Sequence, residues 1–205
     1  MSLPRLRALA HRLPQPVQRA LRRLRRMLRR RPVSTFMRVA YTTPRQVVLI
    51  TTRHEGADNV WPVDWHVPLS FVPDLYGIAL NGNSYGAQLV RGSGVFVVNF
   101  VPATWENAIF LCGNVSGRNV DKFAAAGLSK EEAESVDAPR LAGSLGALEC
   151  KVRQTIEVGD HTLFVGEVSH KVLREDAPRL HHVDIRMTDT PAAGHDVSAS
   201  HTGRP

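Results

Sequence analysis

The stretch LECKVRQTIEVGDHTLFVGEVSHKVL, Leu148 to Leu173, contains the clearest structural signal in the sequence. Its two halves, LECKVRQTIEV and TLFVGEVSHKVL, have the residue types and lengths of strands. Between them, GDH (Gly159–His161) provides the glycine and aspartate that tight turns favour. The stretch therefore predicts an antiparallel β-hairpin with two long arms.

Two further runs predict strands upstream of this hairpin. QVVLITT (Gln46–Thr52) is rich in β-branched residues, and VFVVNF (Val95–Phe100) is a continuous apolar run of the kind found in buried strands. NVWPVDWHVPLSFVPDLYGIAL (59–80) contains three prolines, so we expect one irregular strand, a loop, and a strand from Tyr76 to Leu80.

The predicted helices are short and lie between these strands. They are NSYGAQLVRGSG ending near Gly92, Trp105–Leu111, DKFAAAGL closed by Gly127, and SKEEAE (Ser129–Glu134), which starts with a Ser-x-x-Glu capping box. Strands dominate, and their spacing does not fit βαβ repeats. The fold class predicted is mainly β with short helices, as a closed or partly closed antiparallel barrel.

Length and composition fit one domain with appendages. The 205 residues have no run of about 18 apolar residues, which a membrane-spanning helix needs. The two cysteines, Cys112 and Cys150, suit a reducing compartment, and no residue spacing indicates a metal site. We expect a cytoplasmic protein.

The positive charge is confined to the N-terminus. Residues 1–31 contain eleven arginines, whereas all 19 acidic residues follow His54. Leucines at three- and four-residue spacing predict two short amphipathic helices separated by Pro14 and Pro16. Such an arm could lie on an anionic membrane surface, bind nucleic acid non-specifically, or be an extension without either role.

Three segments follow from these patterns. Residues 1–32 form the basic arm, residues 33–176 form the barrel domain, and residues 177–205 form a polar tail. The tail is rich in Pro, Gly, His and Thr, so we expect it to be disordered, with no strand comparable to those before it.

The motif GNVSGRNVDKF (Gly113–Phe123) allows two interpretations. Ser116, Gly117 and the following backbone could donate to an anion, which Arg118 and Lys122, four residues apart, would clamp while Asp121 held one of these cations. Alternatively, Ser116 or Asn119 simply caps an ordinary surface helix. The sequence around the motif is needed to choose.

Other candidate binding residues are aromatic or amide side chains. In GADNVWPVDW, Asn59 offers a bidentate amide, and Trp61 and Trp65 could stack on an aromatic ligand or pack in the core. His161, in the predicted turn, could bind a ligand or handle protons. Nothing in the sequence activates Cys112 as a nucleophile, and no nucleophile elbow, P-loop, dinucleotide or zinc-protease motif occurs. No catalytic residue is assigned.

In this order the motifs resemble the flavin reductase-like family, whose members have an FMN-binding split barrel. The matching stretches are PRQVVLITT, GADNVWPVDWHVPLSFVPDLYGIAL, NSYGAQLVRGSGVFVVNF, GNVSGRNVDKFAAAGL, LEC and GDHTLFVGEV, which together cover about Pro44 to Leu173. Each is weak alone, but SGRxxDKF followed by LEC and GDHxLFVGEV is a fairly specific series.

The resemblance implies a homodimeric antiparallel split barrel that binds FMN, or FAD, near the dimer interface and takes hydride from NADH or NADPH. By position, the flavin ring would be lined by Asn59, Val60, Trp61, Val63, Asp64 and Trp65. Ser84 would contact the phosphate, Ser116, Gly117, Arg118 and Lys122 would also serve the flavin, and His161 would bind the nicotinamide.

The sequence departs from the family pattern at three places. Forty-three residues precede Pro44, and Pro62 and Asp64 stand where the family has small hydroxyl or apolar residues, so Asp64 would bring negative charge close to a flavin. The family's closing strand has no recognisable counterpart after Leu173. Two functions are compatible with the motifs: a flavin reductase that supplies a monooxygenase, or a protein that holds FMN tightly for electron transfer to a partner or for binding alone.

Overall fold

The computed structural model describes residues 42–183 and 186–190. The predictions for the basic arm, 1–32, and for the last part of the tail lie outside these residues. The description below concerns the compact unit that begins at Pro44.

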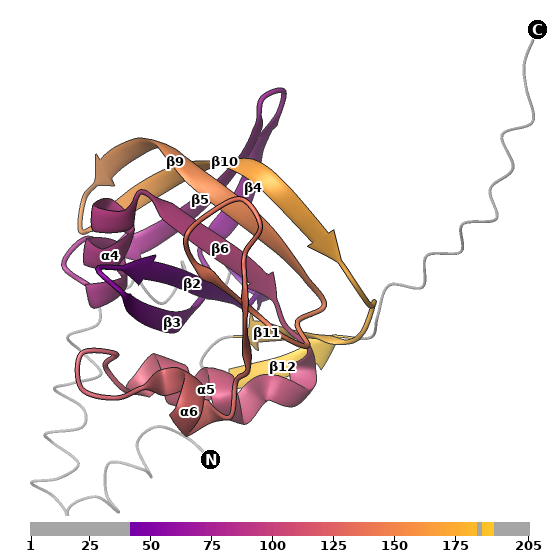
Figure 1. The fold of residues 1–205 in the computed structure, drawn as a ribbon. Coiled ribbons are helices and arrows are strands. Elements are labelled where there is room, and N and C mark those ends of the chain that lie inside the picture. Colours follow the sequence, from indigo (N-terminus) through magenta and orange to yellow (C-terminus); the bar gives the residue numbers. More distant parts are fainter. Residues whose placement is uncertain (1–41, 184–185, 191–205) are drawn as a thin grey trace, which may run out of the picture. The chain divides into compact units, whose positions relative to one another are not determined.

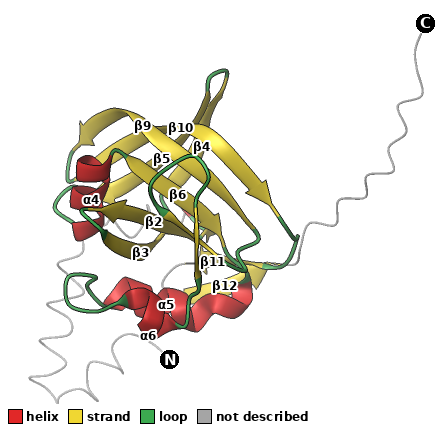
Figure 2. Ribbon diagram, viewed as in Figure 1, coloured by secondary structure: helices red, strands yellow, loops and turns green. Residues whose placement is uncertain are grey.

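A seven-stranded antiparallel sheet dominates the unit, with strand order β3-β2-β6-β9-β10-β5-β4 (Figures 1 and 2). Its members are β2 (Val48–His54), β3 (Ala57–Val63), β4 (His66–Phe71), β5 (Asp74–Asn81), β6 (Val95–Phe100), β9 (Gly146–Val158) and β10 (His161–Leu173). The predicted mainly β fold with an antiparallel split barrel is confirmed.

The long hairpin predicted from Leu148 to Leu173 is present. Strands β9 and β10 pair antiparallel from His161 opposite Val158 to Leu173 opposite Gly146. Gly159 has a φ of 62°, which explains the glycine in the turn because other residues rarely adopt this conformation.

The two edges of the sheet are consecutive in the chain. Strand β3 ends at Val63 and β4 begins at His66, so the short connection through Asp64 and Trp65 joins the edges of the barrel. The Ala79 N–H of β5 donates to the Trp65 carbonyl at 2.8 Å and fixes this connection against the sheet. Because β3 and β5 are not ladder partners, a seam remains between them.

Two apolar clusters pack on the two faces of this sheet. The first joins residues of β2, β5, β6, β9 and β10 with helix α4 (Tyr85–Ser93), and Phe96 and Phe164 are its largest members. The second lies between the β2–β3 side of the sheet and helices α5 (Glu106–Asn114) and α6 (Lys122–Ala126). Figure 1 shows these two helices below β2 and β3, beside β11 and β12.

The helix caps follow from local chemistry. The Ser84 hydroxyl accepts from Ala87 N–H at the start of α4, and Gly127 ends α6 in the left-handed conformation, as DKFAAAGL predicts. Asp121 caps α6 by accepting from Phe123 and Ala124 N–H. The expectation that Asp121 would hold a cation is therefore wrong. The alternative, in which Ser116 or Asn119 caps the helix, is wrong as well.

The predicted helix Trp105–Leu111 is α5, preceded by the 3₁₀ turn η1 (Ala103–Trp105).

The proline-rich stretch 59–80 forms three strands, so the expected loop is wrong. Pro62 lies on the edge strand β3 and Pro68 at an irregularity of the edge strand β4, where the register shifts before Ser70. Edge strands and bulges tolerate proline because the missing N–H is not needed by a neighbour. Strands β4 and β5 form a hairpin whose tip carries Pro73.

SKEEAE does not form the helix that its capping box predicts. Lys130–Glu132 is strand β7, which pairs with β8 (Pro139–Leu141). Tertiary ion pairs decide the outcome, because Arg53 donates to Glu132 at 2.8 Å and Arg140 to Glu131 at 3.1 Å. Both carboxylates are thus held in an extended segment.

A strand also forms where the polar tail was expected to lack one. Strand β11 (Arg179–Val183) pairs with β1 (Arg45–Gln46) and with β12 (Arg186–Thr190). Its Leu180 is 2% exposed and packs in the second cluster, and its carbonyl accepts from Val47 N–H at 2.9 Å. A single buried leucine among polar residues gives little sequence signal, which explains the error.

Two features are absent from the described part of the chain. None of its helices has the length and apolar character needed to cross a bilayer. No group of three or more His, Cys, Asp or Glu side chains in it is arranged to hold a metal ion.

Candidate functional site

Two adjoining hollows lie along β3 and are here called the groove. The first has a volume of about 300 Å³ and the second about 240 Å³. They share Trp61, Pro62 and Ser84, so strand β3 and the N-terminus of α4 line both. Ligand sites in proteins commonly have volumes of this order.

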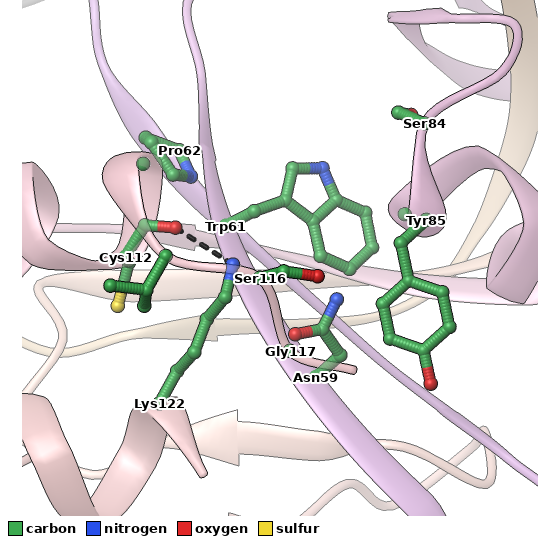
Figure 3. A pocket seen from close by; sticks show the side chains of 12 residues that line it. Asn59, Trp61, Pro62, Ser84, Tyr85, Cys112, Ser116, Gly117 and Lys122 are labelled. Atoms are coloured by element: carbon green, nitrogen blue, oxygen red, sulfur yellow. Dashed lines mark hydrogen bonds between the residues drawn. The ribbon is translucent and has the colours of Figure 1, made fainter. Parts of the chain in front are cut away.

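The first hollow is enclosed by three segments that are distant in sequence (Figure 3). Strand β3 contributes Asn59, Trp61 and Pro62, and α4 begins on the opposite side. The remaining lining comes from the end of α5 and the turn before α6. It comprises Cys112, Gly113, Val115, Ser116, Gly117 and Lys122.

Three buried polar groups in this hollow have unused hydrogen-bonding capacity. The Asn59 side-chain oxygen and the Trp61 indole nitrogen have no hydrogen-bond partner, although Asn59 is only 4% exposed. Lys122 is 6% exposed, and its ammonium donates to the Cys112 carbonyl at 2.7 Å. No carboxylate among the described residues forms an ion pair with Lys122.

Burial disfavours the charged form of this lysine. It lowers the pKa of the Lys122 ammonium from its ordinary value, and the neighbouring Cys112 sulfur only partly offsets it. Burial likewise raises the pKa of the Cys112 thiol, so this group stays protonated at neutral pH. The hollow therefore combines one acceptor, the Asn59 oxygen, with donors from Trp61 and Lys122, and a bound ligand would have to satisfy them.

Two glycines allow the walls of the hollow to approach each other. A Cβ at Gly117 would overlap the Asn59 side-chain oxygen, and a Cβ at Gly86 would lie 2.6 Å from the Trp61 ring. The glycine in SGR is thus needed for close approach to Asn59.

The second hollow lies at the seam of the barrel and is lined by β3, the Asp64–Trp65 connection, the end of β5 and His161. The Trp65 and His161 rings stack, with centroids 4.6 Å apart and planes at 27°.

The Asp64 carboxylate accepts from Arg45 at 3.0 Å and contacts His182 Nδ1 at 2.7 Å. The negative charge expected to disturb a flavin is therefore balanced by Arg45.

The structure brings most of the sequence-predicted site residues into this groove. Its lining includes Asn59, Trp61, Val63, Asp64, Trp65, Ser84, Ser116, Gly117, Lys122 and His161. They come from four separate parts of the chain, which the motif series joined only by resemblance.

Two predicted residues lie elsewhere. Val60 is fully buried in the second apolar cluster, because neighbouring side chains of a strand point to opposite faces. Arg118 donates to Gln88 at 2.6 Å and lies 4.4 Å from the Tyr85 ring centroid, so it fastens the 115–121 turn to α4. Neither residue lines the groove.

Sequence reasoning missed several lining residues. Tyr85, Gly86, Cys112, Gly113 and Val115 line the first hollow, and Ala79, Leu80 and Asn81 line the second. Tyr85 and Gly86 follow the predicted Ser84 directly, so this neighbourhood was the available signal. The β5 residues gave none, because their role depends on how the barrel closes.

The protein is thus a split barrel whose groove combines buried polar groups with aromatic rings. The family model of the flavin reductase like domain matches residues 40–191, so the chain belongs to this family.

Two relatives illustrate what the chain is similar to in sequence. An uncharacterized protein from Archaeoglobus fulgidus is 36% identical over 130 residues, covering 63% of this chain and 73% of that protein. The FMN reductase (NADH) RutF of Ancylobacter novellus is 28% identical over 122 residues, covering 60% of this chain and 65% of the relative.

A solved structure has a similar fold. Nitrilotriacetate monooxygenase component B from Mycobacterium thermoresistibile has a TM-score of 0.68 and 26% identity, covering 83% of this chain and 97% of that one.

Proposed function

We propose that this protein binds FMN in the groove and catalyses hydride transfer from NADH or NADPH to the flavin. Family membership and the name of the RutF relative support flavin reduction as the reaction class. The name of the solved relative, a monooxygenase component, supports a monooxygenase as the consumer of the reduced flavin.

The observation that carries the proposal is the unused hydrogen-bonding capacity of three buried groups in the first hollow. The pyrimidine edge of a flavin alternates carbonyl acceptors with an N–H donor. The Asn59 oxygen needs a donor, whereas Trp61 N–H and the Lys122 ammonium need acceptors. The residues present therefore fit the polar edge of a flavin.

The remaining groove residues have matching tasks. The Lys122 charge would stabilise negative charge that develops at that edge. Ser84, at the N-terminus of α4, would receive the phosphate. Bound flavin would supply the hydride-accepting chemistry, and the protein would bind it, orient it and exclude water.

The test uses the purified full-length chain. Its visible spectrum is recorded before and after FMN is added and excess flavin is removed by gel filtration, and NADH and NADPH oxidation is then followed with free FMN. We expect flavin-dependent oxidation of at least one nucleotide. Oxidation no faster than the background without protein would refute the reductase proposal, and yellow protein without turnover would support the electron-transfer alternative.

A further inference from the structure

The Trp65–His161 stack in the second hollow has a consequence beyond lining the groove. We propose that Trp65 is a positioning residue: its indole holds the His161 imidazole in the orientation that binds the nicotinamide nucleotide. The inference rests on the proposed reductase function, since it concerns the same groove.

Both rings are attached to well-anchored backbone. The Trp65 carbonyl accepts from Ala79 N–H at 2.8 Å, and the next residue, His66, is held through Nδ1 to the Tyr76 hydroxyl at 2.7 Å and through Nε2 to the Gln46 carbonyl at 3.0 Å. His161 begins β10 opposite Asn81 and Val158. The stack therefore connects two fixed ends of strands across the seam.

The His161 ring is restrained from two directions. Its Nδ1 lies 2.8 Å from the Asp160 carboxylate, and one face of the ring lies against Trp65. A hydrogen bond alone allows the ring to rotate about the contact, whereas the added stack fixes its plane. The Asp160 carboxylate is largely exposed to solvent, and the stack on Trp65 adds a second restraint on the ring.

The contact with Asp160 uses only one of the two ring nitrogens. An ionised carboxylate only accepts, so Nδ1 of His161 carries the proton of this contact. Among the described residues Nε2 makes no hydrogen bond. It is available to a polar group of a ligand in the hollow, and the carboxamide and ribose of a nicotinamide nucleotide provide such groups.

This assignment changes the expected role of Trp65. The resemblance places it against the flavin ring, whereas the structure places it against the residue predicted to bind the nicotinamide. Loss of the Trp65 indole should therefore weaken nucleotide use more than flavin use.

The kinetic test compares wild type, Trp65→Ala and Trp65→Phe at saturating FMN. Trp65→Ala should raise the KM for the preferred nucleotide about three- to tenfold, as expected for loss of one aromatic pair, with the KM for FMN changed less than about twofold. Trp65→Phe keeps a ring to stack on and should restore most of the KM. Trp105→Phe, which removes an indole outside the groove, is the matched control.

A second measurement does not depend on activity. The His161 ring protons, assigned by comparison with His161→Gln, should show an upfield ring-current shift in NMR spectra of wild type and Trp65→Phe. This shift should disappear in Trp65→Ala.

The outcomes separate the two proposals. An active wild type whose nucleotide KM is unaffected by Trp65→Ala, or whose FMN KM alone rises, overturns the positioning role and leaves the reductase proposal intact. Absence of the ring-current shift in wild type also overturns it. A wild type that oxidises neither NADH nor NADPH overturns both.

Discussion

Lys122 is a buried charge whose hydrogen bonds are incomplete within the described residues. Its ammonium is buried with a single carbonyl partner, which is unfavourable for an isolated charge. Its pKa is lowered for the same reason, so folding without ligand opposes the charged form. Such a group is explained if a ligand with a negative edge completes its hydrogen bonds.

We therefore predict that Lys122→Met weakens FMN binding about 10- to 100-fold, the usual cost of a lost charge-assisted hydrogen bond. Thermal unfolding without flavin should show no large loss of stability, because a buried unpaired charge is removed. Titration of flavin fluorescence measures the affinity. Lys171→Met, which alters an exposed lysine paired with Asp74, is the control. Unchanged affinity in Lys122→Met would exclude this lysine from the flavin site.

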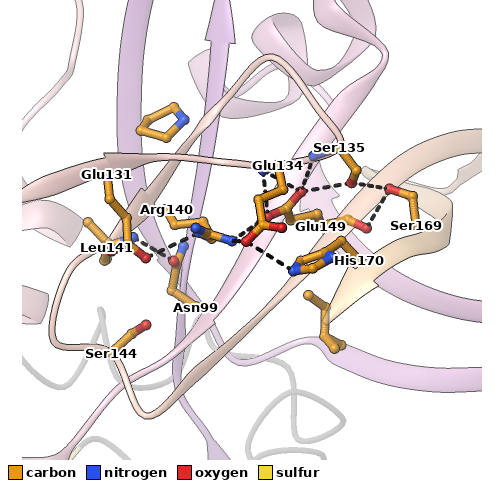
Figure 4. A network of polar contacts seen from close by, with 12 residues as sticks. Asn99, Glu131, Glu134, Ser135, Arg140, Leu141, Ser144, Glu149, Ser169 and His170 are labelled. Atoms are coloured by element: carbon orange, nitrogen blue, oxygen red, sulfur yellow. Dashed lines mark hydrogen bonds and ion pairs between the residues drawn. The ribbon is translucent and has the colours of Figure 1, made fainter. Parts of the chain in front are cut away.

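Glu149, of the LEC motif, is a second buried charge, but a fully satisfied one (Figure 4). Its carboxylate accepts from Ser135 N–H at 2.6 Å, the Ser135 hydroxyl at 2.7 Å, Glu134 N–H at 3.0 Å and Arg140 at 2.9 Å. Burial alone would raise its pKa, but these donors outweigh burial and hold the pKa below 4.5. The motif therefore fixes the 133–145 segment onto the sheet.

The lowered pKa of Glu149 determines how the free energy of unfolding changes with pH. A carboxyl with a depressed folded pKa contributes stability above its unfolded pKa and loses this contribution as the pH falls through the folded value. Glu149→Gln should lower the free energy of unfolding at pH 7 by about 3 kcal/mol and make it less dependent on pH below about 4.5. Urea unfolding between pH 3 and pH 7, with pH values chosen to span the ordinary carboxyl range, measures both effects.

Glu134→Gln is the control, because this carboxylate is exposed. It should lower the free energy of unfolding by less than about 1 kcal/mol. An equal loss in both variants would contradict the special role of Glu149.

At the scale of elements, patterns within one segment gave reliable predictions. The β9–β10 hairpin, strand β6 and helix α6 with its glycine stop all match, because their signals are local turn and cap chemistry. Elements defined by distant partners did not match. Strand β7 depends on Arg53 and Arg140, and β11 depends on a site for Leu180 in the second cluster.

The importance of β11 can be measured directly. Leu180→Ala should lower the free energy of unfolding by about 2–4 kcal/mol, since it leaves a cavity among Val47, Val101 and their neighbours. Leu173→Ala, at a leucine that is 92% exposed, should change it by less than about 0.5 kcal/mol. Chemical denaturation of both variants gives the comparison. Equal small effects would mean that β11 does not contribute to the core.

At the scale of the whole molecule, the β4–β5 hairpin exposes apolar side chains at its tip. Phe71 and Val72 are 93% and 91% exposed, and Val67 and Leu69 are also partly exposed on the same strand. Contiguous apolar surface of this kind is typical of interfaces. We keep the prediction of a homodimer and place this hairpin in its interface.

Light scattering coupled to gel filtration tests this placement. Wild type should elute as a dimer, and a Phe71→Ser/Val72→Ser double variant should shift toward monomer. Leu173→Ser removes an equally exposed leucine from β10 and should remain dimeric. A monomeric wild type, or a dimeric double variant, would contradict the assignment.

The basic arm is a separate question for the whole chain. Liposomes containing anionic lipid should sediment the full-length protein but not a version that begins at Ser34, if the arm binds membrane surfaces. Equal sedimentation of the two would remove that prediction.

The sequence alone was enough to predict the strand-rich composition, the long hairpin, the glycine stop of α6 and, through the motif series, ten of the residues that line the groove. These properties depend on neighbours in the chain, where spacing and turn residues act directly. The tertiary structure decided which of these residues face the groove. In the structure Val60 is buried in the core, and Arg118 lies against the Tyr85 ring. Asp64 pairs with Arg45, and Trp65 stacks on His161. Such contacts depend on how the sheet curves and where its edges meet, which no local pattern encodes.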